Sequence, residues 1–320
     1  MLAVDSRGII PGCRYLAELP KAGMLAEEPA TSLTARTPRS TRTGELSTGN
    51  SSEVQISLSD VQVKMEMLCS YPAQESLQAE GQVDPSEKLH SFTDAAGLLI
   101  GGVQGDDWFS ASEVASMLPK KPSFWLYNFS TQVGEAIGMR ATPPERSYCP
   151  SQTQLYLETG DAPSFRVALE GNWPAIPRVP DQLSTNLSAY NDAVRDLLEK
   201  NGLKGTEISL DSVYKIDLDG DGADEGVLSA NHNANRIFTE GIFQGDYSLL
   251  LLRKLQGNQV VTVPLFERYV QNDDPYSRGA EIEVLALLDL NGDGSMEILA
   301  KENFYQAFRY LVFSVEGKSG

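Results

Sequence analysis

The sequence has few of the residues on which most catalytic and zinc-binding motifs depend. It contains 3 cysteines and 2 histidines among its 320 residues. The histidines, His90 and His232, lie far apart in the chain, and no G-x-S-x-G motif occurs. A histidine-based zinc site or a Ser-His-Asp triad therefore has no support in the sequence. We interpret His232, which lies in an asparagine-rich stretch, as part of a solvated turn.

Three cysteines are also too few for a disulfide framework, and they lack metal-ligand spacing. In an exported protein, Cys69 and Cys149 could form one disulfide, which would leave Cys13 in an N-terminal tail. The alternative is that all three are ordinary thiols.

Long apolar runs and an excess of positive charge are missing as well. No apolar run approaches the length of a transmembrane helix, and the first 20 residues lack the apolar segment of a secretory signal. The 26 basic residues are outnumbered by 44 acidic ones, which gives a formal net charge of −18. Such a chain repels phosphate groups, so the composition argues against nucleic acid and anionic membranes as partners.

Composition divides the chain into three parts. Residues 31–53 are mostly Ser, Thr, Arg and Gly, and such a segment buries too little apolar surface to offset its ordering entropy. We therefore predict a disordered tail or linker over residues 1–53. The proline-rich connector Asn172–Pro180 is the expected domain boundary. It separates an N-terminal α+β region, 54–180, from a C-terminal β-domain, 181–320. We expect Trp173 to pack at this junction; the alternative is an exposed ligand platform.

Hydrophobic patterns predict the main elements on either side of this connector. Leu187, Tyr190, Val194, Leu197 and Leu198 have helical spacing, and Gly202 follows where a helix C-cap glycine belongs. Close backbone packing is the expected role of the glycine pair at 101–102. The other expected elements are a short helix over 111–118 and strands over 54–58, 124–127, 154–157, 165–169, 208–216, 247–253, 259–269, 282–288 and 310–315.

Two acidic stretches carry the clearest chemical signal. Each has an oxygen-bearing side chain at positions 1, 3, 5 and 9 and glycine at positions 4 and 6. Ca²⁺ takes about 6–8 oxygen ligands, and the carbonyl of position 7 adds a backbone oxygen to the side chains. The predicted ligands are Asp217, Asp219, Asp221, Ala223 and Glu225 in the first loop and Asp289, Asn291, Asp293, Ser295 and Glu297 in the second.

The flanks distinguish these loops from EF-hands. An EF-hand needs a bidentate glutamate at position 12, where this chain has Leu228 and Ala300. The segments before both loops, 208–216 and 282–288, are β-like, so the arrangement is strand–loop–strand. Asp-Gly and Asn-Gly pairs also form simple hairpin turns, which is the alternative for one copy. Two copies that match at every ligand position favour a cation loop.

The pattern D-x-[DN]-G-D-G-x-x-[DE], which both copies fit, resembles the calcium-loop repeats of the FG-GAP and VCBS type in integrin α-chains and many bacterial surface proteins. The resemblance covers the loops and their flanking strands; the phenylalanine–glycine and glycine–alanine–proline signature is absent. It implies calcium binding and an extracytoplasmic setting. The similar order of strands around both loops also indicates an internal repeat.

The sequence therefore predicts a β-rich α+β protein whose C-terminal antiparallel β-domain consists of two calcium-loop meander units. The predicted function is that of a non-enzymatic calcium-binding protein of the cell envelope or exterior. It would serve as a binding, adhesion or structural module, with an unidentified protein or carbohydrate partner. The alternative is a metal-dependent hydrolase that uses an acidic loop to cleave a phosphoester.

Overall fold

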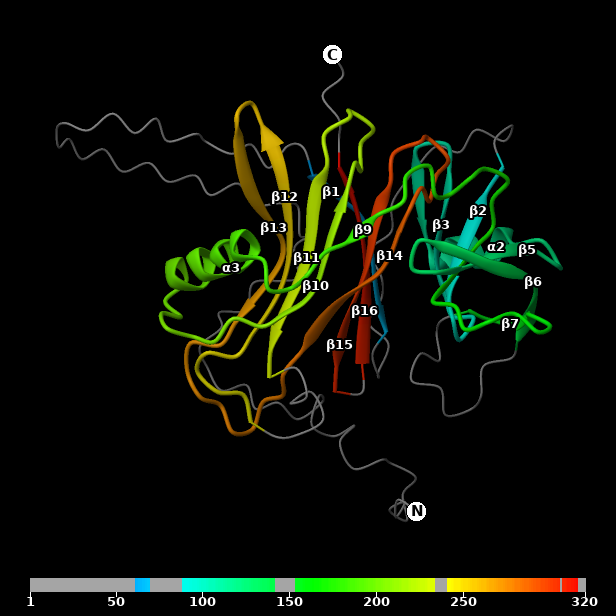
Figure 1. The fold of residues 1–320 in the computed structure, drawn as a ribbon. Helices are drawn as coiled ribbons and strands as arrows, with labels where there is room; N and C mark the ends of the chain where they lie inside the picture. Colours follow the sequence, from blue (N-terminus) through cyan, green and yellow to red (C-terminus); the bar gives the residue numbers. More distant parts are fainter. Residues whose placement is uncertain (1–60, 70–87, 142–152, 234–240, 306, 316–320) are drawn as a thin grey trace, which may run out of the picture. The chain divides into compact units, whose positions relative to one another are not determined.

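Three antiparallel sheets account for most of the described chain, which confirms the predicted β-rich α+β class (Figure 1). The computed structural model describes residues 61–69, 88–141, 153–233, 241–305 and 307–315. The expected tail over 1–53, the expected strand over 54–58 and the second cysteine of the Cys69–Cys149 pair lie outside these residues. The described residues all belong to one compact unit, Ile56–Gly320.

The sheets have seven, five and four strands. The seven-stranded sheet, in the order β4-β3-β2-β8-β5-β6-β7, contains β2 (His90–Asp94), β3 (Leu99–Gln104), β4 (Asp107–Ser110), β5 (Ser123–Asn128), β6 (Thr131–Ala141), β7 (Gln154–Glu158) and β8 (Val167–Leu169). The five-stranded sheet, in the order β13-β12-β11-β10-β9, contains β9 (Asp181–Gln182), β10 (Leu210–Ile216), β11 (Glu225–His232), β12 (Tyr247–Gln256) and β13 (Gln259–Tyr269). The four-stranded sheet, in the order β1-β16-β15-β14, contains β1 (Val61–Cys69), β14 (Glu281–Leu288), β15 (Glu297–Phe304) and β16 (Ala307–Val315).

The two described helices begin and end close to the predicted positions. Helix α2 (Ala111–Met117) begins after Ser110, whose backbone N–H donates to Glu113 Oε2 at 2.7 Å, and it ends before Pro119. Helix α3 (Ser188–Lys200) is followed by Gly202, which has a φ of 83°, and the N–H of Leu203 donates to the carbonyl of Leu198 at 2.8 Å. This hydrogen bond is the one expected of a Schellman motif at a glycine C-cap.

Helix α3 covers one face of the five-stranded sheet (Figure 1). Its buried residues Val194 and Leu198 share a hydrophobic cluster with Leu249 and Leu251 of β12. The residue between these two leucines, Leu250, belongs to a different cluster, which lies between the five-stranded and the four-stranded sheets. Alternate residues of β12 therefore pack on opposite faces, and the strand is buried on both sides.

The four-stranded sheet is also buried on both faces. Val284, Leu287 and Ile298 pack toward the five-stranded sheet, whereas Leu285 and Leu299 join a cluster with the seven-stranded sheet. Burial on both faces explains the continuous apolar run Val284–Leu288 in β14.

The first strand of the described chain belongs to the four-stranded sheet. β1 pairs antiparallel with β16, from Val61 opposite Val315 to Cys69 opposite Phe308. The predicted boundary near residue 180 otherwise separates the strands of the seven-stranded sheet from those of the other two sheets. β1 is the exception, because its pairing with β16 joins the two ends of the described chain in one sheet.

Close packing of backbones explains Gly101 and Gly102 in β3, as predicted. A Cβ atom on Gly102 would lie 2.8 Å from the His90 carbonyl oxygen and from a methyl group of Val114.

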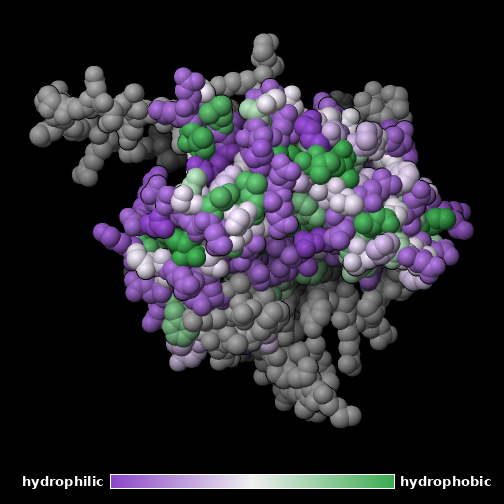
Figure 2. All heavy atoms as spheres, in the orientation of Figure 1, coloured by the Kyte–Doolittle hydropathy of each residue, from purple (hydrophilic) through white to green (hydrophobic). Residues whose placement is uncertain are grey.

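On the face shown in Figure 2, hydrophobic side chains form separate small patches among hydrophilic ones. No helix in the described ranges has both the length and the apolar character needed to span a membrane.

Candidate metal centre in two acidic loops

Each acidic stretch connects two paired strands. The first loop, 217–224, joins β10 to β11, and Ile216 pairs with Glu225 across it. The second loop, 289–296, joins β14 to β15, and Leu288 pairs with Glu297. Both loops are therefore hairpin connections, as the simpler interpretation of their Asp-Gly pairs requires. They are much longer than two-residue hairpin turns, so their shape needs a further explanation.

In the first loop, the carboxylates fold the backbone around themselves. Asp217 Oδ1 accepts the N–H of Gly220 at 2.7 Å, and its Oδ2 accepts the N–H of Gly222 at 3.2 Å. Glu225 Oε2 accepts the N–H of Leu218 at 2.8 Å. The side chains at positions 1 and 9, at the two ends of the loop, therefore both accept backbone N–H groups from within it.

The second loop repeats these hydrogen bonds at the same positions. Asp289 accepts the N–H groups of Gly292 and Gly294 at 2.6 and 3.0 Å, and Glu297 accepts the N–H of Leu290 at 2.8 Å. The bonds at positions 3 and 5 also match: Asp221 N–H to Asp219 (3.1 Å) and Ala223 N–H to Asp221 (2.7 Å) in the first loop, and Asp293 N–H to Asn291 (3.2 Å) and Ser295 N–H to Asp293 (2.7 Å) in the second.

The glycines at positions 4 and 6 have a conformational role. All four of them, Gly220, Gly222, Gly292 and Gly294, have φ between 78° and 89°. A residue with a Cβ atom rarely adopts such angles, and two of them within three residues produce the tight coil. The spacing of the glycines therefore determines where the acidic side chains point.

The carboxylates of Asp217, Asp219 and Glu225 offer ligand atoms that all lie within 4.8 Å of one another. Oxygens bound to one Ca²⁺ at about 2.4 Å each lie at most about 4.8 Å apart, so this group fits a single cation. Asp221 is exposed, and its Oδ1 accepts the N–H of Ala223. The carbonyl ligand at Ala223 and the inclusion of Asp221 in the coordination stay predictions.

The second loop is the more deeply buried of the two. Asp289 is 3% exposed, and burial raises the pKa of its carboxyl group, although the N–H groups of Gly292 and Gly294 oppose the shift. At position 3, Asn291 Nδ2 donates to Asp293 Oδ2 at 2.9 Å. The role of the Asn291, Asp293 and Ser295 oxygens as ligands stays a prediction.

Burial at position 9 raises the pKa of both glutamates when no cation is present. Burial is the main reason that the pKa rises to about 7 for Glu225 and to about 8 for Glu297. The nearby aspartates raise both pKa values further, while the N–H groups of Leu218 and Leu290 lower them. A buried carboxylate needs a compensating positive charge, which a cation between these side chains would supply.

The connector Asn172–Pro180, which is the expected domain boundary, contacts both loops. Trp173 Nε1–H donates to the carbonyl of Asp289 at 2.8 Å, which confirms that this tryptophan packs at the junction. Arg178 donates to the carbonyls of Asp217 and, at 2.8 Å, of Leu218 and Gly294. Nothing in the local sequence distinguishes Arg178 from a solvated arginine, so sequence reasoning missed its role.

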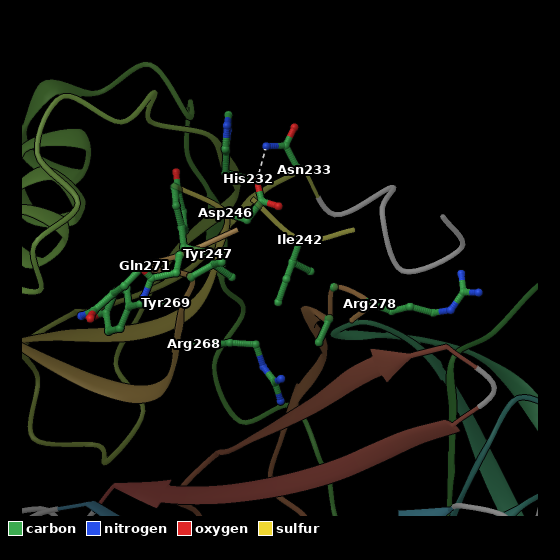
Figure 3. A pocket seen from close by; sticks show the side chains of 13 residues that line it. His232, Asn233, Ile242, Asp246, Tyr247, Arg268, Tyr269, Gln271 and Arg278 are labelled. Atoms are coloured by element: carbon green, nitrogen blue, oxygen red, sulfur yellow. Dashed lines mark hydrogen bonds between the residues drawn. The ribbon is translucent and has the colours of Figure 1, made fainter. Parts of the chain in front are cut away.

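A cavity of about 270 Å³ lies at the opposite end of β11 and β12 from the first loop. Figure 3 shows that Arg268, Arg278 and His232 point in different directions. Arg268 pairs with buried Glu302 at 2.8 Å, and the Arg278 guanidinium stacks 3.8 Å from the centre of the Tyr305 ring. The two arginines that line this cavity therefore do not converge on a common position.

The prediction that His232 lies in a solvated turn is wrong. His232 is the last residue of β11, and its ring stacks on Tyr247, with the ring centroids 5.8 Å apart. The strand extends this far because His232 pairs with Tyr247 of β12, and the preceding Asn231 is buried and accepts the Ser248 hydroxyl at 2.6 Å.

Comparisons with protein-family models, with curated proteins and with solved structures found no match for this chain. The two loops are therefore the features of this chain that indicate its function.

Proposed function

We propose that the two loops each bind one Ca²⁺ and that the cations stabilise the fold of a non-enzymatic protein. The observation that supports this most strongly is the identical set of backbone hydrogen bonds in both loops. These bonds bring the carboxylates of Asp217, Asp219 and Glu225 together in the first loop. The donor set is entirely oxygen, which suits a hard cation. A flexible loop with several carboxylates suits Ca²⁺ better than Mg²⁺, whose octahedral shell is smaller and more rigid.

The position of the loops in the sheets supports a structural role. Each loop joins two neighbouring strands, and the two sheets that carry them pack face to face through Val227, Leu250, Val284 and Ile298. A cation that connects positions 1 and 9 fixes the register at one end of each hairpin. It also removes the repulsion among the clustered carboxylates.

We further propose an extracytoplasmic location, where calcium is abundant enough for loops of this kind. Extracellular calcium modules commonly bind with Kd values of roughly 10⁻⁴–10⁻³ M. The resemblance of both loops to FG-GAP and VCBS repeats supports the same setting. A binding or adhesion role toward a protein or carbohydrate is the function that fits a calcium-stabilised β-rich protein of this kind.

Thermal unfolding in chelator and in excess Ca²⁺ tests the proposal. Each occupied site adds about 2.7 kcal/mol at a hundredfold excess over Kd, which is roughly 5–10 °C in Tm for a unit of this size. We expect recovery of Tm with Ca²⁺ but little with Mg²⁺. An Asp217→Asn, Asp289→Asn double variant should lose the response, whereas Asp192→Asn on the exposed surface of α3 should keep it. A Tm that does not respond to Ca²⁺ after complete chelation would refute the structural role.

A further inference from the structure

The connector 173–178, between β8 and β9, contacts the same positions of both loops. Trp173 donates to the carbonyl of Asp289, and Arg178 Nε–H donates to the carbonyl of Asp217; both aspartates occupy position 1. A Cβ atom on Gly292 would lie 3.0 Å from the Trp173 ring, and one on Gly220 would lie 3.3 Å from the Arg178 guanidinium. The glycine at position 4 of each loop therefore packs against a connector side chain.

Hydrogen bonds also join the two loops to each other, some through Arg178 and one directly. Nη2 of Arg178 donates to the carbonyl of Leu218 in the first loop and to that of Gly294 in the second, both at 2.8 Å. The backbone N–H of Met296, in the second loop, donates to the same Leu218 carbonyl at 2.8 Å. A change in the backbone of one loop therefore disturbs hydrogen bonds made by the other.

We propose that these contacts make the two loops one cooperative unit, in which a cation bound by either loop raises the affinity of the other for its own cation. Arg178 is the positioning residue of this unit, since it donates hydrogen bonds to backbone carbonyls of both loops. The inference rests on the proposed calcium-binding function and adds a regulatory property to it.

The physical basis of the coupling is that ordering one loop also orders part of the other. Without a cation, the clustered carboxylates repel one another and loosen the loop. The first cation to bind orders its own loop and, through the Leu218 carbonyl, Arg178 and Met296, part of the other loop. The second cation then meets a loop that is already partly ordered, so it binds more tightly. Repulsion between the two cations opposes this effect, but three or four carboxylates line each loop and screen it.

Calorimetric titration of the full chain with Ca²⁺ tests the coupling. We expect two sites and a Hill coefficient above 1. Coupling between binding sites is reciprocal, so disabling either loop must weaken the other by the same factor. We therefore expect Asp289→Asn to weaken the first loop, and Asp217→Asn to weaken the second, by an equal factor of at least about five, the low end of typical couplings.

Arg178→Lys isolates the role of the guanidinium, because it keeps the charge but loses the planar fork that reaches three carbonyls. We expect this variant to bind two Ca²⁺ with a Hill coefficient close to 1. Arg195→Lys, at an exposed position of α3, is the matched control and should behave like the wild type. Trp173→Phe, which removes one hydrogen bond to the second loop, should reduce the cooperativity in part. Far-UV circular dichroism in excess Ca²⁺ verifies that each variant is folded.

The outcomes separate this inference from the proposed function. Two independent sites in the wild type, with affinities unchanged in Arg178→Lys, would overturn the coupling and leave calcium binding intact. Cooperativity that survives in Arg178→Lys would overturn the role of Arg178. A wild-type protein that binds no Ca²⁺ would overturn the proposed function itself.

Discussion

Glu297 makes the stability of the metal-free protein depend on pH in an unusual direction. Its side chain is 1% exposed, and burial raises its pKa from 4.5 to about 8. A carboxyl group with a raised pKa stabilises the fold fully only below its unfolded pKa. That contribution disappears as the pH rises through the folded pKa, because the ionised form is the less stable one when buried. The window of lost stability is therefore about pH 4.5 to 8.

The magnitude follows from the size of the shift. One pKa unit corresponds to about 1.36 kcal/mol, so Glu297 alone should lower the free energy of unfolding across this window by an amount on the order of 5 kcal/mol. Glu225, with a pKa raised to about 7, acts in the same direction between about pH 4.5 and 7. A bound cation favours the ionised carboxylates and should reverse the trend, so calcium affinity should increase with pH.

Urea unfolding in chelator between pH 4.5 and 8.5 measures this effect. Glu297→Gln keeps an oxygen to accept the Leu290 N–H but cannot ionise, so its loss of stability with pH should be smaller than that of the wild type by the amount above. Glu199→Gln, at an exposed position of α3, is the control. Equal pH dependence in wild type and Glu297→Gln would show that the pKa of Glu297 is not raised in the metal-free protein.

Three further predictions concern the loops, the core and the tail. The first loop offers four carboxylates and the second only three, so the first loop should bind Ca²⁺ more tightly. Asp217→Asn should therefore remove the tighter calcium site and Asp289→Asn the weaker one. Calorimetry that finds the tighter site lost in Asp289→Asn would reverse the ranking. Leu250 lies between the five-stranded and four-stranded sheets, so Leu250→Ala should lower the free energy of unfolding in excess Ca²⁺ by about 2–5 kcal/mol. A loss below about 1 kcal/mol in urea titration would contradict the packing described. Limited proteolysis should remove residues 1–53 quickly and leave a resistant fragment, whereas protection of 31–53 would contradict the predicted tail.

Elements with a strong local pattern could be predicted from the sequence, and weakly patterned ones could not. Helix α3 and strands β5, β12 and β13 carry clear periodicity and were predicted close to their observed bounds. β2 was missed because its residues are largely polar; Ser91 and Thr93 are nonetheless fully buried, since the strand lies inside the seven-stranded sheet. β6 was missed because its glycines and exposed polar residues resemble a loop.

The sequence by itself determined the candidate site within each loop. The acidic side chains and glycines fall within nine residues of each other, and over so short a distance local backbone geometry dictates which groups meet. The matching hydrogen bonds of Asp217 and Asp289 are therefore already implied by the spacing of the residues.

Only the tertiary structure decided which segments lie together. The backbone groups of one strand are chemically the same as those of any other, so no local pattern specifies that β1 pairs with β16. The same holds for the contact between the loops, which come from different hairpins, and for Arg178, which reaches carbonyls far from it in the sequence. These arrangements result from the packing of two sheets through a common core, and that packing depends on the whole chain at once.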